Sequence, residues 1–259
     1  MDTQKMIVFD IDGTLLDSNK KVLPSTIAAL KSLKKAGHHL FLATGRSLLY
    51  TQSIIKHLGF ENYILCNGAI GFYQHQQIIS KPLDATEIQK FYQKSLELQL
   101  DMAIITLNDL TRLTSFDFTK MQAGMELVGA PVPPLYSNQL NQEEVYQGLA
   151  FFEPQFDREF ENEFKKFNFI RWHENSVDVV ADKLSKATTI LEIASQLAVS
   201  REDIIAFGDG LNDKEMLMHS GIGVAMGNAD AEIQKIADLV TSNNDQDGIF
   251  HALRKLQLI

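Results

Sequence analysis

Two carboxylates near the N-terminus of this 259-residue chain have the types and spacing that chemistry on phosphate needs. Asp10 and Asp12 follow the apolar run Met6–Phe9 directly, and Gly13 comes next. Residues two apart at a strand end face the same side, and glycine lets the backbone turn away sharply. Asp209 follows another apolar run and would add a third negative charge. A hard divalent cation with oxygen ligands relieves such repulsion, so we expect Mg²⁺ here.

The acidic residues can be given separate tasks. We expect the Asp10 carboxylate, the Asp12 backbone carbonyl and the Asp209 carboxylate to bind the metal, and Asp213 to support them. A carboxylate held against a metal-bound phosphate can attack phosphorus and form an acyl phosphate, which makes Asp10 the expected nucleophile. The leaving alkoxide needs a proton, and the water that hydrolyses the acyl phosphate must lose one. Asp12 is placed to serve as the acid and then as the base.

The oxygens of a transferring phosphoryl group need fixed donors around them. We expect four phosphate-binding groups: the Thr44 hydroxyl, the Gly45 amide, the Lys186 ammonium and the Asn212 carboxamide. Lys183 is a weaker rival for the place of Lys186.

Three further residues have two interpretations each. Arg46 either meets the substrate or pairs with a carboxylate at the core surface. Asn67 and Gly68 form either a hinge or a contact near the cap or its substrate, or an ordinary turn.

Short apolar runs alternate with amphipathic segments at both ends of the chain, which predicts a parallel, doubly wound α/β sheet with helices on both faces. Ligands bind at the carboxyl ends of such strands, where the candidate residues stand. The expected strands are Met6–Phe9, His39–Ala43, 63–66, 204–207, Ile222–Ala225 and Leu239–Val240. The expected helices are 25–36, 47–58, 186–197, 212–219 and 231–237.

The middle of the chain, residues 83–184, has a different pattern, with strands next to strands. It begins with a long helix that opens on Asp84, with Glu87 three residues later. Expected strands follow at 102–106, 111–114, 146–152, 168–172 and 177–181, with one helix at 157–167. This order predicts an α+β domain inserted into the first domain.

Four motifs in order resemble the haloacid dehalogenase superfamily. They are Asp10-Ile11-Asp12-Gly13-Thr14-Leu15-Leu16, Thr44-Gly45-Arg46, Lys186, and Gly208-Asp209-Gly210-Leu211-Asn212-Asp213. The Thr-Gly-Arg form, Asn67-Gly68-Ala69 and the long interval before Lys186 resemble its Cof-type branch, subfamily IIB. One position departs from that branch: Ala187 stands where relatives usually have glycine, and alanine favours a helix start.

The resemblance implies a Rossmann-like catalytic core at residues 1–82 and 185–259 and an inserted C2-type cap at residues 83–184. It also implies a Mg²⁺-dependent phosphatase that acts on a small phosphate monoester such as a sugar phosphate, a nucleotide or a phosphorylated cofactor. The family roles match those already given to Asp10, Asp12 and Asp209 and to the four phosphate-binding groups.

The composition limits the binding partners and the cellular location that we expect for the protein. The formal net charge is -9, and no Lys/Arg-rich run is present, so we expect no nucleic acid partner. No apolar stretch approaches a membrane span or a signal segment. One cysteine, Cys66, excludes an intramolecular disulfide. We therefore expect a cytoplasmic protein without a membrane partner, as a monomer or weak homo-oligomer.

Other functions share parts of this pattern. A dehalogenase needs neither a metal nor an acid for its halide, so Asp12 and Asp209 argue against it. A transport ATPase would need membrane spans. A phosphomutase is a further alternative. Its phosphoaspartate must survive long enough to return the phosphate to another hydroxyl, and the sequence does not determine that lifetime. A non-enzymatic phosphoacceptor or binding protein is the remaining alternative.

Overall fold

The computed structural model describes residues 4–127, 129–136, 140 and 143–259 of the chain. These residues divide into two compact units. The first, here called the core unit, comprises the described parts of Met1–Gly45, Ser53–Ile79 and Ser185–Ile259. The second, here called the inserted unit, comprises the described parts of Arg46–Gln52 and Ser80–Leu184.

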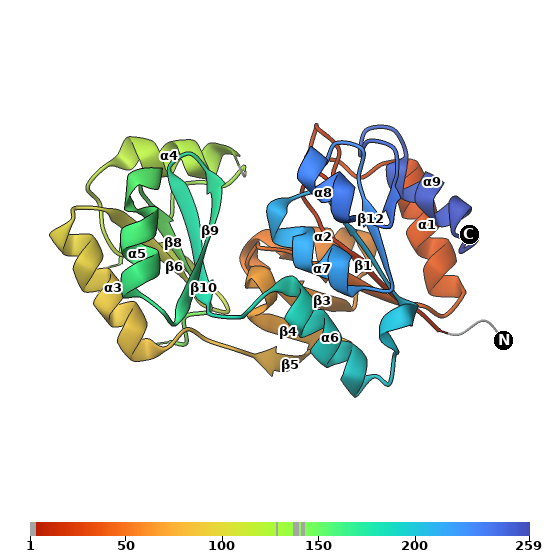
Figure 1. Ribbon diagram of the computed structural model, residues 1–259, viewed down its shortest axis with the longest axis horizontal. Helices are drawn as coiled ribbons and strands as arrows, with labels where there is room; N and C mark the ends of the chain where they lie inside the picture. Colours follow the sequence, from red (N-terminus) through yellow and green to blue (C-terminus); the bar gives the residue numbers. More distant parts are fainter. Residues whose placement is uncertain (1–3, 128, 137–139, 141–142) are drawn as a thin grey trace. The chain divides into compact units, whose positions relative to one another are not determined.

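The sheet of the core unit has, among the described residues, eight strands in the order β13-β12-β11-β1-β2-β3-β4-β5 (Figure 1). The strands from β13 to β3 run parallel, and β4 runs antiparallel to β3. Their bounds are β1 (Met6–Phe9), β2 (His39–Ala43), β3 (Asn62–Leu65), β4 (Ile70–Tyr73), β5 (Gln76–Ser80), β11 (Ile204–Gly208), β12 (Ile222–Ala225) and β13 (Leu239–Val240). Strand β1 is buried along its whole length, as expected for a parallel strand covered on both faces.

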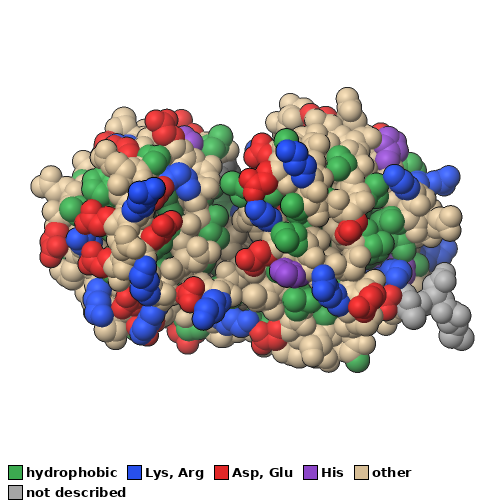
Figure 2. Space-filling model, in the orientation of Figure 1, with side chains coloured by type: hydrophobic (Ala, Val, Ile, Leu, Met, Phe, Trp, Pro, Cys, Tyr) green, Lys and Arg blue, Asp and Glu red, His purple; other side chains and the backbone are tan. Residues whose placement is uncertain are grey.

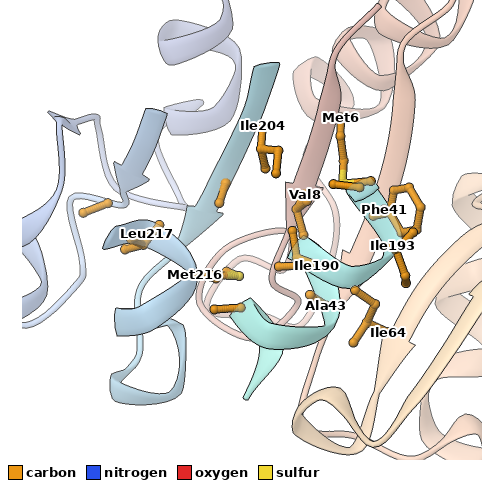
Figure 3. Packing of buried hydrophobic residues seen from close by; sticks show 14 of the residues in the cluster. Met6, Val8, Phe41, Ala43, Ile64, Ile190, Ile193, Ile204, Met216 and Leu217 are labelled. Atoms are coloured by element: carbon orange, nitrogen blue, oxygen red, sulfur yellow. The ribbon is translucent and has the colours of Figure 1, made fainter. Parts of the chain in front are cut away.

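Helices cover both faces of this sheet (Figure 1). Ile190 and Ile193 of α6 pack with Val8, Phe41 and Ile64 in one apolar cluster, shown in Figure 3. Helices α1 and α9 contact one another and stand outside that cluster, so they cover the other face. The bounds are α1 (Pro24–Lys35), α2 (Leu48–Leu58), α6 (Lys186–Gln196), α7 (Lys214–His219), α8 (Ala231–Ile236) and α9 (Gly248–Lys255). The α/β fold with a parallel-sheet core is as the sequence predicts.

Three features of the core unit differ from the sequence prediction. Strands β4 and β5 form a hairpin that extends the sheet, and α9 closes the chain; neither was predicted. The hairpin turn, Gln74 and His75, has φ of 49° and 62° without the Asn-Gly signal that usually marks such a turn. Cys66 was expected in a strand. Instead β3 ends at Leu65, and Cys66 begins a short 3₁₀ turn that ends at Gly68.

The inserted unit is an antiparallel sheet in the order β7-β6-β8-β10-β9, with helices packed against it. The bounds are α3 (Ala85–Glu97), β6 (Asp101–Ile105), β7 (Leu110–Arg112), α4 (Phe118–Leu127), β8 (Gln147–Phe151), α5 (Asp157–Glu163), β9 (Phe167–His173) and β10 (Ser176–Ala181). Asp84 caps α3 by accepting the Glu87 backbone N–H at 2.9 Å, as its sequence predicts. This is the α+β architecture expected of the inserted cap.

Two helices of the inserted unit differ from the prediction. Helix α4 was not predicted. Helix α5 ends at Glu163 rather than at 167, because Phe164 and Phe167 turn into a cluster of aromatic side chains around Phe91. Their burial in that cluster outweighs local helix propensity.

Charged side chains of both signs are interspersed on the face drawn in Figure 2. In the part of the chain that the structure describes, no helix combines the length and the apolar character that a membrane crossing requires.

Candidate active site

The core unit brings the predicted residues to one edge of its sheet because β11, β1 and β2 are parallel neighbours. Asp10 follows β1, and its N–H donates to the Phe207 carbonyl at 3.0 Å. Thr44 follows β2, and its N–H donates to the Ile64 carbonyl at 3.0 Å. Asp209 follows β11. The carboxyl ends of three strands therefore meet, as open parallel sheets arrange their ligand sites.

Lys186 enters the site as the first residue of α6. Ser185 caps the helix: its side chain accepts the Thr188 N–H, and the Thr188 hydroxyl accepts the Ser185 N–H. Alanine at position 187 is buried in the apolar cluster below the helix, where it leaves Lys186 at the helix start. The exposed Lys183 pairs with Asp182 instead.

Lys186 bridges two buried carboxylates. Its Nζ lies 2.7 Å from Asp10 Oδ1 and 2.7 Å from Asp213 Oδ1. The side chains of Lys186 and Asp213 are almost completely buried, and Asp10 is 6% exposed. Asp213 Oδ2 accepts the backbone N–H groups of Asp209 and Gly210, both at 3.0 Å. Asp213 thus holds the lysine and the loop that carries Asp209.

The charges of this cluster strongly perturb one another. Burial raises the pKa of Asp10 well above its usual range, and the neighbouring Asp213 adds to the effect while Lys186 opposes it. Burial and Asp213 also raise the pKa of Asp209 to about 7, against the hydrogen bond from Thr14. Burial acts to lower the pKa of Lys186, but Asp10 and Asp213 outweigh it and raise that pKa. The cluster therefore has more negative charge than Lys186 alone stabilises.

The same carboxylates fit a hard metal ion. Asp10, Asp209 and Asp213 each offer one oxygen, and these three oxygens lie within 4.8 Å of one another. An all-oxygen set with surplus negative charge is what Mg²⁺ prefers.

Gly13 is required for the approach of Asp209. Its φ is +77°, and a Cβ placed there would lie 2.1 Å from Asp209 Oδ2. Thr14 Oγ1 donates to Asp209 Oδ1 at 2.9 Å. Asn228 Nδ2 donates to the Gly13 carbonyl at 2.8 Å and thereby holds the same loop. Asn228 was not predicted as a site residue, although it comes shortly after the predicted strand Ile222–Ala225, as the other candidate residues follow their strands.

Asp12 lies at the edge of the cluster. It is half-buried, and its Oδ1 forms an ion pair with Lys20 Nζ at 3.1 Å. Its side chain is not among the three that offer the clustered oxygens. The backbone carbonyl remains its predicted contribution to a metal.

The structure also joins Asn212 to the turn after β3. Asn212 Nδ2 donates to Asn67 Oδ1 at 3.1 Å, and the Asn67 N–H donates to the Thr44 carbonyl at 3.0 Å. Gly45 lies against the Asn67 carboxamide, and the Gly68 carbonyl accepts the Thr189 hydroxyl at 2.7 Å. Asn67 and Gly68 therefore lie beside Thr44, Gly45 and Asn212, at the carboxyl-end edge of the core sheet.

Arg46 groups with the inserted unit, where its Nη1 donates to the Tyr50 carbonyl at 3.4 Å. Its role as a substrate contact stays a prediction.

The sequence and the fold match known proteins over nearly the whole chain. A family model described as haloacid dehalogenase-like hydrolase matches residues 7–253. YkrA of Bacillus subtilis (strain 168) is 34% identical over 255 residues, which cover 98% of each chain.

Two solved structures extend the comparison. BT1666 of Bacteroides thetaiotaomicron, studied among the phosphatases of this superfamily, superposes with a TM-score of 0.92 at 29% identity, over 99% of this chain and 96% of its own. The subclass IIB sugar phosphatase BT4131 superposes with a TM-score of 0.86 at 28% identity, over 99% of this chain and all of its own. This chain is therefore a member of the haloacid dehalogenase-like hydrolases, of the Cof-type branch in subclass IIB, and it hydrolyses phosphate monoesters.

Proposed function

We propose that the chain is a Mg²⁺-dependent phosphatase that removes phosphate from a small soluble monoester through a phosphoaspartate on Asp10. The observation that carries the proposal is the buried Asp10 carboxylate, held by Lys186 within 4.8 Å of oxygens from two further aspartates. A carboxylate fixed in this way is a nucleophile with its charge supported and its rotation restricted.

In the first step, an Asp10 carboxylate oxygen attacks phosphorus. A bond from Asp10 to phosphorus forms, the ester P–O bond breaks, and the alkoxide leaves with a proton from Asp12. In the second step, Asp12 takes a proton from water as the water oxygen attacks phosphorus. The bond from phosphorus to Asp10 breaks, inorganic phosphate leaves, and the Asp10 carboxylate is restored.

Asp10, the Asp12 backbone carbonyl and Asp209 would hold the Mg²⁺, with Asp213 positioning Asp209 through two backbone N–H groups. Bound there, the ion would neutralise the surplus carboxylate charge and polarise the phosphate oxygens. Lys186 would meet the same oxygens, and the Thr44 hydroxyl, the Gly45 N–H and the Asn212 amide would complete the set of donors.

In this proposal the inserted unit determines which class of substrate is accepted. We assign residues 83–184 as the cap that selects the substrate and residues 1–82 and 185–259 as the catalytic core. The similarity to the sugar phosphatase BT4131 supports sugar phosphates as the first class to test, ahead of nucleotides and phosphorylated cofactors. A cytoplasmic location is part of the proposal, and the single cysteine supports it.

The test is phosphate release from sugar phosphates, nucleotides, pyridoxal phosphate and an aryl phosphate, with Mg²⁺ or with a chelator. Wild type is compared with Asp10→Asn, which keeps the shape of the side chain and removes the nucleophile. The matched control is Asp230→Asn, the same change at an exposed residue. Mass spectrometry of acid-quenched wild type should also find phosphate on Asp10.

We expect Mg²⁺-dependent turnover that Asp10→Asn lowers by about 1,000-fold or more and that Asp230→Asn leaves unchanged. Turnover that survives Asp10→Asn, or that is the same in the chelator, would contradict the proposed mechanism. Transfer of phosphate to a second sugar hydroxyl rather than to water would favour a phosphomutase.

A further inference from the structure

The turn Cys66–Gly68 after β3 is buried, and it contacts two of the four sequence motifs and the start of the helix that carries a third. The proposed chemistry gives this turn no task. Asn67 is 1% exposed and has φ 54° and ψ 27°, in the left-handed region. Asparagine occupies that region more readily than most residues, but not without cost. A buried polar side chain on a strained backbone, next to the candidate phosphate-binding residues, calls for a structural or functional reason.

The contacts of Asn67 supply that reason. Its N–H donates to the Thr44 carbonyl at 3.0 Å, which fixes the backbone just before Gly45. The O/N edge of its carboxamide faces Gly45: a Cβ there would lie 3.0 Å from Asn67 Oδ1, 3.1 Å from Asn67 Nδ2 and 3.4 Å from Asn67 Cγ. The backbone N–H therefore holds the segment whose hydroxyl and N–H are the proposed phosphate donors, and the close approach leaves no room for a side chain at Gly45.

The second contact reaches a residue 145 positions away in the sequence. Asn212 Nδ2 donates to Asn67 Oδ1 at 3.1 Å. The opposite orientation of the Asn212 carboxamide would place its oxygen against the Asn67 oxygen, and two acceptors repel each other. Asn67 Oδ1 therefore selects the orientation in which the Asn212 NH₂ group faces Asn67, and it leaves one N–H of that group for another acceptor.

The third contact comes from Gly68. Its carbonyl accepts the Thr189 hydroxyl of α6 at 2.7 Å, and a Cβ at Gly68 would lie 2.4 Å from the Ser185 carbonyl. The turn is thus in direct contact with the first turns of the helix that begins at Lys186.

We propose that Asn67 is a positioning residue for phosphate binding. Its Oδ1 holds the Asn212 carboxamide with an N–H directed at the phosphate, and its backbone N–H fixes the Thr44–Gly45 segment. This inference rests on the proposed function, in which Asn212, Thr44 and Gly45 contact the transferring phosphoryl group. Asn67 itself acts through these residues and transfers no proton.

The test is a double-mutant cycle. Asn67→Gly removes the carboxamide and keeps a residue that tolerates positive φ. It is combined with Asn212→Ala, and kcat/KM is measured for the four proteins. The matched control is Asn62→Gly, the same change at a buried asparagine at the other end of β3, where the side chain bonds to Leu40 and Gln74.

We expect Asn67→Gly to lower kcat/KM by about 10- to 100-fold, because a small displacement of a phosphate donor has an effect of that size. The double variant should be little worse than Asn212→Ala alone, because Asn67 acts through Asn212. Asn62→Gly should lower the Tm and leave kcat/KM near wild type. Asn67→Ala should match Asn67→Gly in kcat/KM and have a lower Tm, since alanine disfavours positive φ.

Binding of inorganic phosphate in the presence of Mg²⁺, measured by calorimetry, gives a second readout that needs no turnover. Asn67→Gly and Asn212→Ala should each weaken it, and again not additively. If wild type releases no phosphate, the proposed function fails, while this binding result still decides the role of Asn67. Wild-type kcat/KM and phosphate affinity in Asn67→Gly, or losses that multiply in the double variant, would overturn the inference.

Discussion

Asp10 in the core unit and Asp101 in the inserted unit are both buried, and they are held in different ways. Asp101, which begins β6 in the inserted unit, is 3% exposed. Its oxygens accept the backbone N–H groups of Phe116 and Asp117 at 2.8 and 2.7 Å and contact the Thr114 hydroxyl. These donors are neutral and lie within 16 residues along the chain. Asp101 therefore fixes a loop.

Asp10 in the core unit has a cation from α6 as its partner and two further carboxylates beside it. Its partner stands 176 residues away in the sequence. The difference between Asp10 and Asp101 shows that burial of a carboxylate does not by itself indicate a catalytic or ligand-binding role. Negative charge left over after the protein's own cation is counted is the sign that a ligand belongs there.

The apolar clusters of the two units also differ in the kind of side chain they contain. The cluster of the core unit that contains Ile190 and Ile193 of α6 is mostly aliphatic, with Phe41 buried in it and Tyr73 packed against it, whereas Phe9 and Phe207 stack elsewhere in the same unit. The cluster of the inserted unit gathers several phenylalanines, with Phe91 and Phe160 at a ring-centroid distance of 5.2 Å. Each unit thus has an apolar core of its own.

The largest effect should come from Lys186→Met. It leaves Asp10 and Asp213 buried without their cation, so we expect a loss of about 3–5 kcal/mol in unfolding free energy. Turnover should fall by about 1,000-fold or more, because a phosphate-binding cation is lost as well. Denaturant unfolding and phosphate release measure the two effects. Lys183→Met, at an exposed neighbour, serves as the control and should change neither the unfolding free energy nor the turnover. Near-normal turnover in Lys186→Met would show that Lys186 does not take part in catalysis.

The contrasting change in the inserted unit is Asp101→Ala. It should lower the unfolding free energy by about 2–3 kcal/mol, because two buried backbone N–H groups lose a charged acceptor. Hydrolysis of a small aryl phosphate should change little at a temperature where the variant is folded. A strong loss of kcat for that substrate, with the Tm unchanged, would show that Asp101, like Asp10, takes part in the reaction.

The pH dependence of the metal-free protein sharpens the comparison further. The pKa of Asp209 is raised to about 7 in the folded state from an ordinary value near 4. Between these values the unfolded state releases the proton and the folded state keeps it, so stability falls as pH rises from about 4 to 7. In a chelator, the Tm advantage of Asp209→Asn over wild type should therefore grow from pH 5 to pH 8. Mg²⁺ at pH 8 should raise the Tm of wild type more than that of the variant. A Tm difference that is the same at every pH would contradict the raised pKa.

The smallest effect should follow Lys20→Met. Lys20 and Asp12 form an ion pair whose side chains are 52% and 37% exposed, and exposed pairs contribute little. We expect kcat/KM to change by roughly twofold or less, and any difference from wild type to vanish at high salt. A large loss of kcat would instead show that Lys20 holds Asp12, the proposed general acid and base, in place.

The sequence alone determined the α/β core, the α+β architecture of the middle region and the position of the candidate residues at the strand ends. These predictions succeed because the strands of a buried parallel sheet are apolar throughout and the segments after them share one edge. The capped start of α3 is likewise local, since Asp84 and Glu87 are neighbours on one helical turn. Neither the hairpin β4–β5 nor α4 and α9 has a strong local signal, and these elements were missed.

Only the tertiary structure decided how the site residues are paired. The bonds from Lys186 to Asp10, from Asn212 to Asn67 and from Asn228 to Gly13 join residues 145 to 215 positions apart. No local pattern encodes such a pairing, because it depends on which strands are neighbours and in which register they align. The sequence chose the side chains, and the packing of the sheet and its helices determined which of them hold one another in place.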